Sequence, residues 1–259
     1  MLWLLNLTNI QKQLQGFSKY CPFGREYYKT PMIMYLCPRQ LLAQHMDKHS
    51  FNKLLHDYCA AHTTPPDPVL QALERETHLK TLAPQMLSGH LQGQLLQLLS
   101  SLLQPKSILE IGTFTGYAAI CLARGLAPGG RLHTIEPNRE LEHLIRKYIA
   151  LAGLEAAIQL HIGRAEEMIP VLDISFDLVF IDAGKQQNAF FYDLIFDKVR
   201  PGGLILIDNV LWGGKIVNER AHDVDTQLIR TFNDKIHADE RVENIMLPIR
   251  DGLLIARKH

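Results

Sequence analysis

The amino-acid sequence predicts an α/β protein with a doubly wound, largely parallel sheet. From residue 107 onward, short apolar runs alternate with segments of helical period, which is the pattern of repeated βα units. Two of these runs, residues 176–182 and 203–208, are apolar almost throughout, as strands covered on both faces are. The last two runs are separated only by residues 248–252, too short a connection for a helical crossover, so we expect an antiparallel hairpin there.

The boundaries of each element follow from the same pattern. Strands are expected at residues 107–112, 131–136, 158–163, 176–182, 203–208, 242–247 and 253–257. Helices are expected at residues 115–125, 138–152, 165–172, 188–199 and 223–237. Upstream, we expect a helix at 50–61 capped by Ser50 and another from Pro68 to Leu79 capped by Asp67. A further amphipathic helix is expected to place five leucines on one face, namely Leu91, Leu95, Leu98, Leu99 and Leu102.

Composition limits the class of protein. Lysine plus arginine and aspartate plus glutamate both number 27, and a zero formal charge argues against binding long nucleic acid through many phosphates. The four cysteines form no CxxC pair and no zinc-like cluster with histidine, so we expect reduced thiols in a cytoplasmic protein. Because no apolar run reaches ~18 residues, no transmembrane helix and no membrane partner are expected.

Residues 1–45 differ from the rest of the chain. Their aromatic residues, prolines and cysteines are scattered without a steady period. We therefore expect an N-terminal appendage that is poorly ordered, with an oligomer contact as the alternative. Residues 46–259 are predicted to form the folded domain.

Polar side chains follow two of the predicted strands. Asp182 ends the run 176–182, and Asp208, 26 residues later, ends the run 203–208 and precedes Asn209. If the strands are neighbours, their ends lie about 5 Å apart at the carboxyl edge of the sheet. Three oxygen ligands at that edge suit a hard divalent cation, Mg²⁺, Mn²⁺ or Ca²⁺. A single aspartate at a strand end usually caps the next helix, but two aspartates with Asn209, and with Lys185 close by, are less easily explained by capping.

A glycine-containing turn follows the first predicted strand. Gly112 and Gly116 give the spacing GxxxG instead of the dinucleotide fingerprint GxGxxG, which makes NAD a weaker candidate. The second strand ends in Glu136, where an acidic side chain can accept hydrogen bonds from both hydroxyls of an adenosine ribose. The alternative is that Glu136 only caps the helix that begins near Asn138.

Three motifs in order carry a resemblance to a known family: EIGTFTGY at 110–117, FIDAGK at 180–185 and IDNVLW at 207–212. Over residues 50–259 the chain resembles the cation-dependent class I O-methyltransferases of the caffeoyl-CoA and catechol type. The resemblance implies S-adenosylmethionine as methyl donor, a divalent cation, a seven-stranded Rossmann-like methyltransferase sheet with a reversed C-terminal hairpin, and a homodimer. It makes residues 46–259 the methyltransferase domain.

The resemblance also implies roles for individual residues. Donor contacts are implied for Met86, Gly89, Glu110, Gly112, Thr113, Glu136, Ala165 and Asp182, with Glu136 at the ribose and Ala165 at the adenine. Asp182, Asp208 and Asn209 are implied as the metal ligands. Two positions depart from the family: Ala118 stands where serine is common, and Gly184 stands where a second acid is common. The glycine casts doubt on a typical acyl-CoA contact.

The predicted chemistry is methyl transfer to a hydroxyl. A divalent cation lowers the pKa of the acceptor hydroxyl, and alignment with the donor contributes about 7–11 kcal/mol. Asp182 is expected to hold the cation, and Lys185, three residues later, to act as general base because a neighbouring cation lowers its pKa. A surface lysine paired with a carboxylate is the alternative. Trp212 could stack on an aromatic acceptor or pack against the helix near Asp223.

We therefore expect an S-adenosylmethionine-dependent O-methyltransferase acting on a small catechol-like aromatic. The alternative within the family is methylation of a hydroxylated uridine in tRNA, which the zero net charge disfavours. An NAD-dependent dehydrogenase and a non-enzymatic ligand sensor are further alternatives.

Overall fold

The computed structural model describes the backbone of residues 48–259 and the side chains from Asn52 onward, apart from Lys185. The predictions for residues 1–45, including the domain boundary after residue 45, lie outside these described residues. The first described helix, α3 (Lys48–Ala61), already includes Ser50, so the prediction of Ser50 as its N-cap is wrong. The fold below is that of residues 58–259, which form a compact unit of their own.

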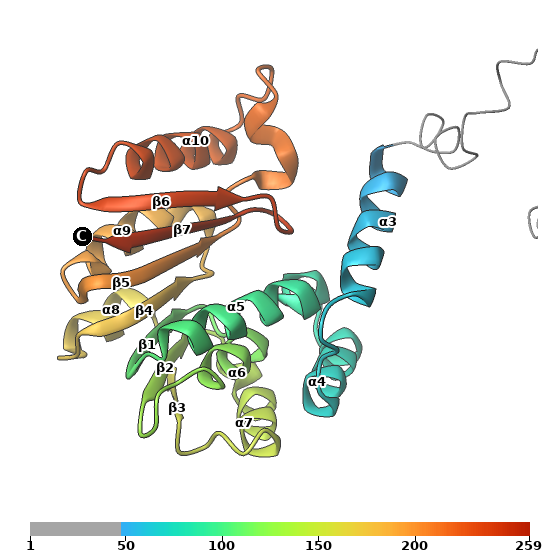
Figure 1. Ribbon diagram of the computed structural model, residues 1–259, viewed down its shortest axis with the longest axis vertical. Coiled ribbons are helices and arrows are strands. Elements are labelled where there is room, and N and C mark those ends of the chain that lie inside the picture. The colour runs from blue at the N-terminus through green and yellow to red at the C-terminus, as the bar shows by residue number, and fades with distance from the viewer. Residues whose placement is uncertain (1–47) are drawn as a thin grey trace, which may run out of the picture. The chain divides into compact units, whose positions relative to one another are not determined.

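Seven strands form one sheet in the order β3-β2-β1-β4-β5-β7-β6 (Figure 1). β1 to β5 run parallel, and β7 pairs antiparallel with both β5 and β6. The strands are β1 (Ser107–Ile111), β2 (Arg131–Glu136), β3 (Ile158–Ile162), β4 (Phe176–Ile181), β5 (Val199–Asp208), β6 (Val242–Leu247) and β7 (Leu253–Lys258). The predicted doubly wound sheet with a reversed C-terminal hairpin is therefore confirmed. β5 begins earlier than expected, at Val199, because the chain pairs with β4 through the irregular stretch before Gly203.

Helices cover both faces of the sheet (Figure 1). One face packs against α4 (Pro68–Lys80), α5 (Gly89–Leu103), α6 (Tyr117–Ala123) and α7 (Glu142–Leu151). The other packs against α8 (Ala165–Val171), α9 (Asn188–Phe196) and α10 (Val224–His237). Successive strand residues alternate between the two cores: Leu178 and Phe180 of β4 face the first, and Val179 and Ile181 the second. Coverage on both faces explains why the central strands are mostly apolar on both of their sides.

α4 is fixed at its start and on its buried side. The N–H of Leu70 donates to Asp67 Oδ1 at 2.9 Å, with Pro68 at the first helical position, so the predicted cap is confirmed. On the buried side, Thr77 Oγ1 donates to Thr115 Oγ1 at 3.0 Å. This second bond holds the loop between β1 and α6, which becomes important at the site.

The predicted leucine face of α5 is confirmed only in part, since Leu95 and Leu99 pack against the first core. Leu98 and Leu102 are exposed, and the buried positions are Gln92, Gly93, Leu96 and Ser100. A Cβ at Gly93 would collide with the Tyr117 ring and the Cys121 sulfur of α6, so α5 can approach α6 closely only through small residues. The apolar pattern therefore placed Leu98 and Leu102 on the wrong side of α5 and missed Gly93, through which α5 approaches α6 closely.

Three short 3₁₀ segments lie at the carboxyl edge of the sheet or beside it: η3 (Pro84–Met86), η5 (Lys185–Gln187) and η6 (Trp212–Val217). A fourth, η4 (Arg139–Leu141), precedes α7, so the helix expected at 138–152 is divided into two parts. Within the described part of the chain, no helix is long and apolar enough to cross a membrane.

Candidate active site

The register of the parallel strands brings the predicted site residues to one edge. Ile111 of β1 is paired with Ile135 of β2 and with Ile181 of β4, and Ile181 is paired with Ile207 of β5. The next residue of each strand is Gly112, Glu136, Asp182 and Asp208 in turn. These four residues therefore form a row along the carboxyl ends, where open α/β sheets bind ligands.

Gly112 is required by the close approach of β4. Its φ is +95°, and a Cβ at this position would overlap the backbone oxygen of Asp182. The N–H of Asp182 donates to Ile111 O at 2.9 Å, and the N–H of Gly112 donates to Ile135 O at 3.1 Å. The turn after β1 is thus held between β2 and the end of β4, and only glycine leaves room for this arrangement.

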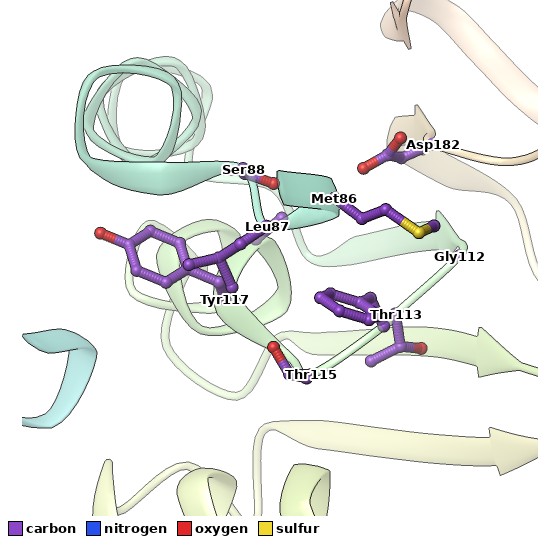
Figure 2. Close-up of a pocket in the computed structure, with 10 residues that line it drawn as sticks. Met86, Leu87, Ser88, Gly112, Thr113, Thr115, Tyr117 and Asp182 are labelled. Atoms are coloured by element: carbon purple, nitrogen blue, oxygen red, sulfur yellow. The ribbon is translucent and has the colours of Figure 1, made fainter. Parts of the chain in front are cut away.

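A small pocket opens beside this turn (Figure 2). The empty space between its walls, open solvent included, is about 200 Å³. Figure 2 shows Met86 and Asp182 on the side opposite Thr113 and Thr115. The wall consists of Met86, Leu87, Ser88, Gly112, Thr113, Phe114, Thr115, Tyr117, Ala118 and Asp182. The structure therefore brings together four of the predicted donor residues: Met86, Gly112, Thr113 and Asp182.

Glu136 joins the two loops on the donor side. The N–H of Phe114 donates to its Oε2 at 2.8 Å, and the N–H of Asn138 donates to its Oε1 at 2.8 Å. Burial raises the pKa of this carboxyl, and the hydrogen bonds from the backbone lower it. The capping alternative is partly realised, because Glu136 does accept from Asn138. The helical start itself is capped by the Asn138 side chain, which accepts from the Glu140 N–H at 3.0 Å.

Glu110 lies behind the pocket instead of in its wall. It is completely buried on β1, and its Oε2 accepts a short hydrogen bond from Thr134 Oγ1 of β2. Thr134 Oγ1 is also hydrogen-bonded to Thr113 Oγ1, which must be the donor because the Thr134 proton goes to Glu110. Burial raises the pKa of Glu110 well above its usual value. Glu110 thus orients the pocket residue Thr113 through Thr134, which the sequence did not reveal as a site residue.

Besides Glu110 and Glu136, two further predicted donor residues do not line the pocket. Gly89 is the first residue of α5, one position after the wall residue Ser88, and has a φ of +72°. Ala165 is the first residue of α8 and is buried in the second core. Their contacts with the donor stay predictions.

Asp182, Asp208 and Asn209 meet at the ends of β4 and β5, as predicted. Asn209 Nδ2 donates to Asp182 Oδ1 at 3.1 Å, and the Asn209 N–H donates to Asp208 Oδ1 at 2.8 Å. Asn209 makes both contacts from a left-handed backbone with φ +62°, a conformation that asparagine tolerates better than most residues. Asp208 Oδ2 accepts from Gln92 Nε2 of α5 at 2.8 Å, and Gln92 is completely buried.

The two carboxylates are electrostatically unfavourable as they stand. Burial, together with the charge of Asp208, raises the pKa of Asp182 to about 8. Burial also raises the pKa of Asp208, while the hydrogen bonds from Gln92 and Asn209 and the charge of Arg250 lower it. A divalent cation would compensate both charges, so the donor set fits a hard cation.

The third ligand must come from a carboxamide. Among the described residues, no group of three histidine, cysteine, aspartate or glutamate side chains could hold a metal. Asn209 would supply the missing oxygen after rotation of its amide, since the nitrogen now faces Asp182. The residues present therefore fit a cation held by two carboxylates and one amide oxygen.

The remaining predicted residues flank this cluster. Lys185 begins η5, three residues after Asp182, but its side chain lies outside the described part of the chain, so its role stays a prediction. Lys215 Nζ lies 5.5 Å from the Trp212 ring centroid and 3.8 Å from Asp223 Oδ2. η6 is therefore connected to the start of α10 through Lys215, and stacking of Trp212 on an acceptor stays a prediction.

Comparisons with known proteins agree with this geometry. Residues 60–259 match the family model described as O-methyltransferase. The chain belongs to the O-methyltransferase family. It is 36% identical to the catechol O-methyltransferase of Niastella koreensis over 174 residues, which are 64% of this chain and 79% of the relative. The predicted family and enzyme class, an S-adenosylmethionine-dependent O-methyltransferase, are confirmed at this level.

Solved structures of family members have the same fold. The O-methyltransferase of Bacillus cereus, in complex with SAH, superposes with a TM-score of 0.73 at 31% identity, covering 80% of this chain and 97% of that one. The O-methyltransferase TomG of Streptomyces achromogenes, in complex with SAM, gives a TM-score of 0.74 at 32% identity, covering 82% and 99%.

Proposed function

We propose that this O-methyltransferase transfers a methyl group from S-adenosylmethionine to a hydroxyl of a small catechol-like aromatic, with a divalent cation, most simply Mg²⁺. The observation that carries the proposal is the position of Asp182. This residue lines the pocket and also accepts a hydrogen bond from Asn209 at the end of β5. Donor and acceptor oxygen would therefore meet at one residue.

The donor side supports binding of an adenosyl sulfonium compound. Gly112 allows the backbone to approach a ligand closely, and the Thr113 hydroxyl is oriented from behind by Thr134. Glu136 retains lone pairs for ribose hydroxyls beside the backbone hydrogen bond that each of its oxygens accepts. Met86 and Leu87 cover the pocket from the opposite side, where they would exclude water from the sulfonium.

The acceptor side supports activation of a hydroxyl. Asp182, Asp208 and the Asn209 amide would hold the cation, which supplies Lewis-acid stabilisation of an acceptor oxyanion when bound. Lys185, at the start of η5, is proposed to accept the hydroxyl proton. Two vicinal oxygens of a catechol match the positions that three protein ligands leave open on a six-coordinate ion.

Three broader assignments accompany the proposal. The single methyltransferase domain at residues 46–259, the homodimer and the cytoplasmic location stay predictions. Light scattering of the purified chain would test the homodimer directly, because a dimer doubles the scattering mass.

The test is a donor-turnover assay with a panel of catechols and with hydroxylated tRNA, in Mg²⁺ or in excess chelator. We expect turnover with a catechol that requires the metal. Lys185→Ala should slow turnover by ~10²–10⁴ without weakening donor binding, whereas Lys106→Ala, away from the site, should change neither. Full activity in chelator would contradict the cation, and salt-sensitive activity on tRNA alone would favour the other acceptor.

A further inference from the structure

The turn between β6 and β7, residues 248–252, contacts segments on both sides of the proposed site. The Arg250 guanidinium donates to the backbone oxygens of Leu87 and Gln85, the second through Nη2 at 3.0 Å. The adjacent residue, Asp251, accepts from the Leu211 N–H through its backbone oxygen at 2.8 Å, and from the Gly213 N–H through its side chain. One turn thus holds the segment over the pocket and the loop that follows Asn209.

Arg250 occupies a backbone conformation that favours glycine. Its φ is +51°, in the left-handed region, which is unfavourable for a residue with a Cβ. At Gly252, two residues later, φ is +91° and a Cβ would overlap Leu211, so contact explains the glycine there. At position 250 the backbone conformation gives no reason for arginine. The hydrogen bonds of the side chain are therefore the feature that accounts for arginine at this position.

The segment that Arg250 contacts is attached to the rest of the fold at two points. η3 contains no buried residue, and Met86 is exposed although it lines the pocket. The backbone hydrogen bonds of this segment are local, from Met86 N–H to Ala83 O and from Leu87 N–H to Pro84 O. Leu87 packs into the first core, and Arg250 is the second attachment, made to the carbonyls on either side of Met86.

We propose that Arg250 is a positioning residue that holds residues 85–87 against the donor pocket and so sets the affinity for the methyl donor; this inference rests on the proposed function. A guanidinium is a planar fork that can donate to two carbonyls of one segment at once, which a lysine ammonium does with less geometric constraint. The positive charge of Arg250 also lowers the pKa of Asp182 and of Asp208, so the group is close enough to both carboxyls for its charge to act on them.

The experiment measures binding of S-adenosylhomocysteine by calorimetry, in chelator, together with the melting temperature of each variant. Arg250→Gly removes the two hydrogen bonds and relieves the left-handed backbone. We expect its dissociation constant to rise by about 10-fold, the loss of two ordinary hydrogen bonds, while its melting temperature does not fall. Arg250→Met should weaken binding similarly, and Arg250→Lys should restore part of it.

The matched control is Arg257→Met, which removes an exposed arginine of β7 that pairs with Glu243 at 2.9 Å, and it should bind as the wild type does. The inference is overturned if Arg250→Gly and Arg250→Met bind the ligand as tightly as the wild type. It is also overturned if both variants lose binding only in proportion to a lowered melting temperature. A wild-type protein that does not bind S-adenosylhomocysteine would instead refute the proposed function.

Discussion

The donor side of the site (Glu110 and Glu136) and its proposed metal side (Asp182, Asp208 and Asn209) differ in the hydrogen-bond partners of their carboxyl groups. On the donor side, both oxygens of Glu136 accept backbone hydrogen bonds, while Glu110 accepts from Thr134 through Oε2 and its Oε1 has no partner among the described atoms. On the metal side, Asp182 and Asp208 lie close enough for each other's charge to matter, and Asp182 receives one amide hydrogen bond. The chain itself supplies hydrogen-bond donors to both oxygens of Glu136, whereas the second side has two neighbouring carboxyl groups whose charges a bound cation would compensate.

Glu136 is therefore held by the fold itself, whereas the carboxyl groups of the proposed metal side depend on a ligand. Changing a group whose hydrogen bonds the fold already provides should destabilise the protein, because the partners of that group are left unpaired. Groups that await a ligand carry an unfavourable interaction in the free protein, so removing one of them can stabilise the fold while it abolishes function. Mutations on the two sides should therefore change the stability of the protein in opposite directions.

The largest effect is expected at Asp182. Asp182→Asn keeps an oxygen for the Asn209 amide but removes one of the two carboxyl groups at the ends of β4 and β5. We expect turnover at saturating donor and Mg²⁺ to fall by roughly 10²-fold or more, since several kcal/mol of charge stabilisation are lost. In chelator the melting temperature should stay the same or rise.

Asp197→Asn, at the exposed end of α9, is the matched control and should change neither quantity. A fall of several degrees in the melting temperature of Asp182→Asn in chelator would contradict the expectation that the two sides differ in this way.

The donor side should respond to Gly112→Ala in the opposite way. The new Cβ would overlap the Asp182 backbone oxygen and would force a left-handed alanine. Left-handed backbone costs about 1–2 kcal/mol and overpacking about 1–3 kcal/mol, so the free energy of unfolding should fall by roughly 2–5 kcal/mol in urea titrations.

Gly129→Ala isolates the backbone part of that cost. Gly129 has φ +75°, and no described atom lies within 4 Å of the position that a Cβ would take, so only the left-handed strain applies. That strain costs about 1–2 kcal/mol. Equal losses in the two variants would show that the approach of β4 to Gly112 does not limit this position.

A smaller effect is expected where α5 contacts the metal side. Gln92→Leu removes the hydrogen bond to Asp208 and also removes Gln92 Oε1, which has no partner among the described atoms. Partners of metal-bound carboxylates commonly contribute about 10–100-fold to metal affinity or activity. We therefore expect the Mg²⁺ concentration for half-maximal activity to rise by that factor.

Gln94→Leu is the control, because Gln94 is a half-buried glutamine of the same helix that lies outside the buried contact with Asp208. It should leave the Mg²⁺ requirement as it is. An unchanged Mg²⁺ requirement in Gln92→Leu would mean that Asp208 is oriented without help from α5.

The smallest effect concerns a histidine pair away from both sides. His133 Nδ1 lies 3.1 Å from His161 Nε2 on neighbouring strands, and burial, His161 and Arg131 lower the pKa of His133 below its ordinary value. The unfolded chain then binds more protons as pH falls below about 6.5, so stability present above that pH is lost on acidification. The slope for this group is at most about 1.4 kcal/mol per pH unit.

His133→Gln should flatten the dependence of unfolding free energy on pH below about 6.5, measured by urea titration at each pH. His143→Gln, at an exposed histidine of α7, should leave the dependence as it is. Parallel curves for wild type and His133→Gln would assign the acid sensitivity to another group.

The sequence predicted the parts of the site that adjacent strands place together. Asp182, Asp208 and Asn209 could be grouped because ligands at the ends of neighbouring parallel strands must meet, and β2 and β6 have the predicted bounds. The turn at Gly112 could be predicted because a missing side chain after a first strand signals close approach.

The sequence did not predict contacts between distant segments. Gln92 and Asp208 are 116 residues apart, and Arg250 and Leu87 are 163 residues apart, so no local pattern connects them. Thr134 was missed because a threonine in a buried strand is ordinary. The leucine face of α5 was wrong at Leu98 and Leu102 for a related reason: Gly93 lets α5 and α6 approach closely, and a hydrophobic pattern does not record a missing side chain.

The position of β7 in the sheet has a consequence for synthesis of the chain. β7 lies between β5 and β6, so one edge of β5 stays without its neighbour while a ribosome adds residues 209–252. An unpaired strand edge is a template for wrong association, and this interval is therefore the most vulnerable stage for the nascent polypeptide. Asp208 is the last residue of that strand and is paired with Leu253, so this end of the proposed site gains its final neighbour only when the hairpin docks.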